Sequence, residues 1–235
     1  MKELTQKRKH VEDSEDHWIS TADLMSGLMI VFLFIAVAYM YNMQNIAKSY
    51  VDTKKEIYDA LYIEFKDDLS KKDWGASIDP KTLTITFNAP NIQFSSNQTE
   101  LKTEYQNVLN DFFPRYLNVL MQYKISINEV RIEGHTDSKW FDAKDDTQAY
   151  FKNMALSQGR SRSVLEYVYS LDSVKQLENW MKQNISAVGF SSAKVIHNSD
   201  GKENEEASRR VSFRVITNAE KSIDKILGVG VENET

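Results

Sequence analysis

One stretch near the start of the chain stands out in the pattern of apolar and polar positions. Residues 24–43 are predominantly apolar and carry no formal charge. A helix needs about 20 such residues to cross a hydrocarbon core of about 30 Å, so this stretch predicts one membrane-spanning helix. Two other interpretations stay open: a buried helix of a soluble domain, and a cleaved signal peptide with a small-x-small site at residues 36–38.

The next stretch, residues 44–69, predicts an amphipathic helix continuous with the span. It contains no Pro or Gly, and its apolar residues recur at mixed three-, four- and seven-residue spacings between charged ones. The apolar stripe consists of Ile46, Tyr50, Ile57, Leu61, Phe65 and Leu69. Such a stripe needs a partner, and we expect a second copy of the chain or the membrane surface. A solvated spacer helix is the remaining alternative.

The rest of the chain alternates between strand and helix patterns, which predicts an α+β fold with a two-layer sandwich of mixed sheet and helices. Strands are expected at 77–88, entered by a turn at Asp79 and Pro80, and at 129–135, 185–190 and 209–217. Helices are expected at 99–123, 153–170 and 174–182. The predicted parts are a tail at 1–19, a span at 20–43, an arm at 44–73, a domain at 74–218 and a tail at 219–235.

Composition narrows the classes of function. The chain has 235 residues, a net charge of −5 and no clustered basic face, which argues against nucleic-acid binding. It contains no Cys, so disulfides, thiolate zinc sites and cysteine nucleophiles are excluded. His10, His17 and His197 are too scattered to form a metal site, and we expect His135 to pack at a strand end. No nucleophile and base pair is visible, so we expect neither an enzyme nor a bound cofactor.

Asp23 lies at the start of the apolar run, beside Ser20, Thr21 and Ser26. An ionisable group at the edge of a membrane helix costs several kcal/mol unless it pairs, faces water or takes up a proton. Asp23 could therefore have a function in the membrane. It could equally be an ordinary carboxylate at the N-terminus of a helix, stabilised by the helix dipole.

Basic residues favour a cytoplasmic N-terminus only slightly. Four precede the span, at positions 2, 7, 8 and 9, and three follow it, at positions 48, 54 and 55. Orientation therefore depends on the nature of the C-terminal domain.

Four ordered sequence blocks resemble the OmpA-like peptidoglycan-binding domain. The blocks are Ile132-Glu133-Gly134-His135-Thr136-Asp137, Asn153-x-x-Leu156-Ser157-x-x-Arg160-Ser161-x-x-Val164, Ala187-Val188-Gly189-Phe190 and Arg209-Arg210-Val211-Ser212-Phe213. The resemblance implies a β/α/β/α/β fold that binds the diaminopimelate of the peptide stem. It would place the C-terminal domain in the periplasm.

By the same resemblance, Asp137 would take the ammonium group of the stem and Arg160 its carboxylate. Asn153, Thr136 and Leu156 would shape the floor of the pocket. These two residue types also suit such a ligand without the resemblance, because a zwitterionic amino-acid end needs an anionic acceptor and a bidentate donor held apart. An ion pair between Asp137 and Arg160 that ties a loop to a helix is the alternative.

Two departures from the family pattern concern the shape of this pocket. An insertion at 138–152 includes Trp140 and Phe141, and Ser208 stands where the family usually has Asn. Arg209 and Arg210 are expected to be structural, with one of them pairing with Glu205 or Glu206.

The segment from His17 to Met29 resembles the opening of the flagellar stator B subunit, in which Ala-Asp precedes a methionine-rich membrane helix. A span, a juxtamembrane helix and an OmpA-like domain follow in that family's order. The short tail, the short arm and the long insertion are more similar to the B subunit of Zorya anti-phage defence systems.

The resemblance implies a single-pass protein of the bacterial inner membrane with a cytoplasmic N-terminus. Its partners would be a second copy of itself, a ring of multi-span A subunits, peptidoglycan and membrane lipid. Asp23 would carry a proton or a sodium ion. A flagellar stator subunit and a passive tether between membrane and wall are the alternatives.

Overall fold

The computed structural model describes residues 2–69 and 74–218, in two compact units that divide after Ser49. The connection at 70–73 and the tail at 219–235 lie outside the described residues, as do the side chains of residues 2–20, of Ser49 and of Tyr50, a member of the predicted stripe. Helix α1, Lys2–Leu69, continues from the apolar stretch into the arm, as the sequence predicts.

Among the described residues, one helix is long and apolar enough to span a membrane, and its apolar window lies within residues 21–69. None of that window is buried within the described chain, which is the opposite of what a buried helix of a soluble domain would show.

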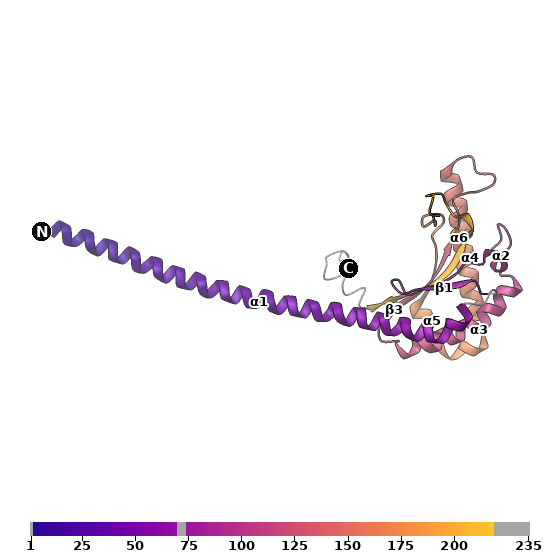
Figure 1. Ribbon diagram of the computed structural model, residues 1–235, viewed down its shortest axis with the longest axis horizontal. Helices are drawn as coiled ribbons and strands as arrows, with labels where there is room; N and C mark the ends of the chain where they lie inside the picture. Colours follow the sequence, from indigo (N-terminus) through magenta and orange to yellow (C-terminus); the bar gives the residue numbers. More distant parts are fainter. Residues whose placement is uncertain (1, 70–73, 219–235) are drawn as a thin grey trace. The chain divides into compact units, whose positions relative to one another are not determined.

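The C-terminal unit contains a five-stranded mixed sheet with strand order β1-β2-β5-β3-β4. Figure 1 shows the strands of this unit, with β1 and β3 labelled, beside its helices. The strands are β1 Ala76–Asp79, β2 Thr84–Phe87, β3 Ile127–His135, β4 Ile185–Gly189 and β5 Arg210–Thr217. Strands β3 and β4 are parallel, and the other neighbours are antiparallel. The helices of this unit are α2 Pro90–Gln93, α3 Thr103–Gln122, α4 Asp146–Tyr169, the 3-10 helix η1 Asp172–Leu177, α5 Glu178–Asn184 and α6 Glu205–Ser208.

The mixed α/β architecture agrees with the prediction, with three local differences. The helix expected at 174–182 is the 3-10 helix η1 followed by α5. The segment expected as one strand at 77–88 is a hairpin, because the turn after Asp79 folds β1 back against β2. Asp79 stabilises that turn by accepting hydrogen bonds from the backbone of Lys81 and the hydroxyl of Thr82, each at 2.8 Å. Helix α4 also begins earlier than expected, because Asp145 caps it by accepting a bond from the amide of Gln148 at 2.7 Å.

One hydrophobic core lies between the sheet and its helices, and aromatic residues dominate its centre. Phe112 of α3 lies 5.1 Å from Phe87 of β2 and 5.0 Å from Phe213 of β5, centroid to centroid. Tyr116 contacts both Phe112 and Phe213. The alternating inward positions of the strands meet the apolar stripe of α3, as the periodicity predicts.

The arm corrects one prediction. Ile57, Leu61 and Phe65 of α1 are fully buried in this same core, so their stripe packs against the chain's own domain and not against a second copy or the membrane. Phe65 lies 5.2 Å from Phe112, centroid to centroid. The guanidinium of Arg115 reinforces the contact by donating to Glu64 and Asp68 of α1, at 2.6 and 2.8 Å.

Candidate functional site

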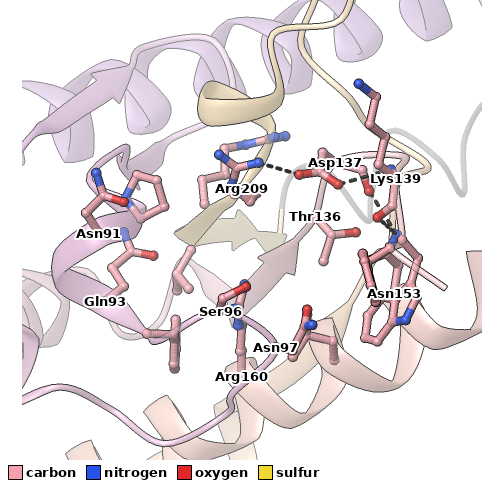
Figure 2. Close-up of a pocket in the computed structure, with 17 residues that line it drawn as sticks. Asn91, Gln93, Ser96, Asn97, Thr136, Asp137, Lys139, Asn153, Arg160 and Arg209 are labelled. Carbon is pink, nitrogen blue, oxygen red and sulfur yellow. Dashed lines mark hydrogen bonds and ion pairs between the residues drawn. The ribbon is translucent and has the colours of Figure 1, made fainter. Parts of the chain in front are cut away.

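The candidate site is a hollow of about 530 Å³ where the C-terminal end of β3, helix α4 and the loop after α2 meet (Figure 2). All five residues that the sequence assigns to a peptidoglycan pocket line it. They are Thr136, Asp137, Asn153, Leu156 and Arg160.

Two close backbone approaches, one from β3 and one from β4, bring the sheet against α4. A Cβ atom added at Gly134 would lie 2.3 Å from the carbonyl oxygen of Ser157, and one added at Gly189 would lie 2.4 Å from the amide nitrogen of Gln158. Only glycine permits this approach. It sets the end of β3, two residues before Asp137, against the middle of α4, which carries Arg160.

Asp137 is oriented by contacts on both carboxylate oxygens. Its Oδ1 accepts from the amide of Lys139 at 3.0 Å, and its Oδ2 accepts from Nη1 of Arg209 at 2.5 Å. The alternative of an Asp137–Arg160 ion pair is therefore wrong, because Arg209 is the partner. Figure 2 shows the Arg209 side chain directed at Asp137 from the segment that leads into β5.

Arg209 also forms the expected ion pair with Glu205, at 4.0 Å, but its shorter ion pair is the one with Asp137. Glu205 pairs more closely with Lys139, at 2.6 Å. Arg210 donates to the carbonyl oxygens of Ser208 and Lys194. Arg209 is an additional residue of the hollow that the sequence did not indicate, because no spacing along the chain shows that it lies opposite Asp137, 72 residues earlier.

Arg160 is buried and held by the loop after α2. Its Nε donates to the carbonyl oxygen of Gln98 at 3.0 Å, and Nη2 donates to that of Ser95 at 3.3 Å. Its guanidinium carbon lies 4.8 Å from the ring centroid of Phe94. These two bonds use two of the five N–H donors, so others can face a ligand.

Burial and the positive charge of Arg209 lower the pKa of Arg160 to about 10, against the opposing charge of Asp137. Arg160 therefore remains a cation at neutral pH. Among the three side chains Asp137, Arg160 and Arg209, the hollow therefore has two cations and one anion. This arrangement suits a ligand with one ammonium group and more than one carboxylate.

Two further predicted residues have different roles. Asn153 holds the loop that carries Asp137, and Thr136 has a hydroxyl group that a ligand could bind. Asn153 donates to the carbonyl oxygens of Asp137 and Lys139, each at 3.1 Å, and thereby fixes the loop. Thr136 is anchored through its amide to the carbonyl oxygen of Ser191 at 3.0 Å. Its buried hydroxyl has no hydrogen-bond partner among the described residues, which is costly unless a ligand or water supplies one.

Near the other end of the chain, Asp23 lies within the length of helix α1, and its side chain is exposed. Because the helix begins at Lys2, Asp23 is not an N-terminal carboxylate, and that alternative is wrong. Ser26 donates its hydroxyl to the carbonyl oxygen of Ala22 at 2.7 Å within the same helix. The side chain of Ser20 lies outside the described residues.

His135 and Ser208 are structural. The ring of His135 stacks on Phe190 at 5.2 Å between centroids, with Nε2 3.3 Å from Glu133. Burial lowers the pKa of His135, and the charges of Arg210 and Lys194 lower it further, against the effect of Glu133. Ser208, at the position where the family usually has Asn, accepts a hydrogen bond from the amide of Ile196 at 2.8 Å.

The sheet order, the pocket at the end of β3 and the preceding apolar helix define the class of protein. It is an OmpA-like domain that follows a single candidate membrane span, and residues 93–209 match the model of the OmpA family. A solved structure described as a MotB-like protein, from Desulfovibrio vulgaris, shares the fold. It has a TM-score of 0.51 and 18% identity, over 73% of this chain and 98% of that one.

The particular family follows from comparison over the whole chain. The Zorya protein ZorB of one Escherichia coli strain is 47% identical over 223 residues, which cover 92% of this chain and 94% of the relative. A second protein of that name, from another E. coli strain, is 28% identical over 89% of this chain and 83% of its own length. The chain belongs to the ZorB family.

Proposed function

We propose that this chain is the wall-anchored B subunit of an ion-driven stator complex in the bacterial inner membrane, of the Zorya anti-phage defence type. The observation that carries the proposal is the 47% identity to a Zorya protein ZorB, which extends over span, arm and domain alike. In this proposal the chain has no catalytic activity of its own and needs no cofactor.

The outer domain holds the complex to peptidoglycan. A diaminopimelate end fits between Asp137, which accepts its ammonium group, and Arg160, which donates to its carboxylate. Arg209 orients Asp137 and supplies the second cation. The buried hydroxyl of Thr136 offers a further hydrogen bond inside the hollow. Leu156 provides the apolar wall.

The membrane helix carries the ion. The N-terminus lies in the cytoplasm and the domain in the periplasm, so that the domain reaches the wall. Asp23 takes up and releases a proton, or coordinates a sodium ion, at the contact with a ring of multi-span A subunits. Ser20, Thr21 and Ser26 are the neighbouring polar groups. A carboxylate exposed on an apolar helix needs such a proton, ion or partner.

Replacement of Asp23 tests the ion-carrying role. Asp23→Asn keeps the size of the side chain and removes its ionisable group, so phage protection should be lost while the amount of protein in the membrane stays the same. Asp52→Asn is the matched control, because Asp52 is exposed on the same helix beyond the apolar stretch. Protection is measured as plating efficiency, beside an immunoblot of the membrane fraction.

The passive tether is the second candidate, and the same experiment separates the two. A tether needs the wall pocket but no titratable group in the membrane, so Asp23→Asn would then protect as well as the wild type. Genes for a multi-span membrane protein and for helicase- or nuclease-like proteins next to this one would support defence. Flagellar neighbours would favour the flagellar stator alternative.

A further inference from the structure

The loop that follows Asp137 presents two aromatic side chains at the edge of the hollow. Trp140 is half-buried, and Phe141 is 98% exposed. Both residues line the hollow that holds Asp137 and Arg160. A fully exposed aromatic side chain contributes nothing to the folded core, and its ring face is available to a ligand.

Several contacts hold this loop in place. Lys152 of α4 pairs with Asp142 at 2.7 Å, and its Nζ lies 5.7 Å from the ring centroid of Trp140. The carbonyl oxygen of Lys139 is bound by Asn153 at 3.1 Å. Phe141 is therefore exposed on a loop that these contacts fix to α4.

A second hollow, of about 940 Å³, lies along the other flank of the same loop. It shares Lys139, Trp140 and Phe141 with the first hollow, so the aromatic pair borders both hollows. Its lining adds the ring of Tyr150 and a run of polar residues, among them Lys144 and Thr147.

We propose that Phe141 and Trp140, with this second hollow, bind the sugar ring to which the peptide stem is attached. An N-acetylhexosamine has one face of C–H groups and a rim of hydroxyl and amide groups. The C–H face stacks on an aromatic ring, and the rim takes hydrogen bonds from polar neighbours such as Lys144 and Thr147. This inference rests on the proposed wall binding and names a further part of the same ligand.

Distance along the stem supports the assignment. Two residues, L-alanine and D-glutamate, separate the diaminopimelate from the muramic acid, and an ordinary extended chain covers about 3.5 Å per residue. The D-glutamate is linked through its γ-carboxyl group, so the stem is longer than two ordinary residues and can reach from Asp137 and Arg160 to Trp140 and Phe141, which line the same hollow. Charged residues of both signs in the second hollow, Lys144 and Asp146, disfavour a lipid tail as the occupant.

Calorimetric titration of the full chain in detergent tests the proposal with two ligands. One is the free tripeptide of L-alanine, D-glutamate and diaminopimelate, and the other is the same tripeptide on its N-acetylglucosamine and N-acetylmuramic acid disaccharide. Phe141→Ala should weaken binding of the disaccharide ligand roughly tenfold and leave binding of the free tripeptide unchanged. Phe141→Trp should retain the affinity for both.

Phe151→Ala is the matched control, because Phe151 is 64% exposed on α4 and lines neither hollow. Equal affinity of wild type and Phe141→Ala for the disaccharide ligand would overturn the sugar site. The exposed aromatic pair would then be a candidate contact for a protein partner. Binding of the disaccharide ligand alone, with loss in Phe141→Ala, would support the sugar site and overturn the stem pocket. If the wild type bound neither ligand, wall anchoring and the sugar site would both be wrong.

Discussion

At the scale of single residues, three charges decide what the hollow can hold. Asp137 does not meet Arg160 directly but is held by Arg209, while Arg160 is held by backbone carbonyl groups of the loop after α2. Each charged group is thus oriented before a ligand arrives, which lowers the cost of binding. The separation of the anion from the buried cation is what a zwitterionic ligand requires.

A second residue-scale consequence concerns pH, through His135. Its pKa is lowered from 6.5 by burial, with Arg210 and Lys194 adding to the effect and Glu133 opposing it. As pH falls below about 6.5, the unfolded chain binds a proton that the folded chain refuses, so stability falls with acid until the folded pKa is reached. One proton corresponds to a slope of at most about 1.4 kcal/mol per pH unit.

We therefore expect His135→Gln to flatten this dependence. Glutamine can still donate to Glu133 but does not titrate, so the free energy of unfolding should change less between about pH 7 and about pH 5. The measurement is a set of urea unfolding curves at several pH values for both proteins. Identical slopes for variant and wild type would show that His135 is not the titrating group.

At the scale of elements, the last turns of α1 are part of the domain core. Ile57, Leu61 and Phe65 are buried there, and Arg115 joins α3 to Glu64 and Asp68. The helix that leaves the membrane segment therefore ends inside the domain that is proposed to hold the wall.

Phe65→Ala tests this packing. Phe65 is 0% exposed and contacts Phe112 and Trp74, so its loss should lower the free energy of unfolding by about 3 to 5 kcal/mol. Ile63→Ala is the control on the same helix, because Ile63 is 69% exposed, and it should cost less than about 0.5 kcal/mol. Urea unfolding followed by tryptophan fluorescence measures both, and equal costs would mean that the arm is not part of the core.

At the scale of the whole molecule, the two proposed activities belong to separate parts of the chain. Asp23 lies in the unit of residues 1–49, and the wall pocket lies wholly in the unit of residues 50–235. Loss of one activity should therefore leave the other intact.

Sedimentation with purified peptidoglycan sacculi checks this separation. Asp23→Asn should sediment with sacculi like the wild type, whereas Asp137→Asn should lose most of this binding, because the neutral amide cannot pair with an ammonium group. We expect a loss of roughly tenfold or more in bound protein at limiting sacculi. Both variants should remain in the membrane fraction, and Asp52→Asn is again the control. Equal sedimentation of Asp137→Asn would contradict the assigned pocket.

Periodicity along the sequence by itself determined the membrane-length apolar stretch, the continuous helix after it and most strands and helices of the domain. These features depend on neighbours a few residues apart, which a local pattern records. The four sequence blocks likewise brought Asp137 and Arg160 forward as candidates for one site.

Only the tertiary structure decided which groups meet across the fold. The stripe of the arm could have packed against any apolar surface, and the fold placed Phe65 against Phe112 of its own domain. The carboxylate of Asp137 could have paired with any nearby cation, and the sheet order brought Arg209 to it. Contacts of this kind depend on how distant segments pack, because hydrophobic burial and ion pairing act through space and not along the chain.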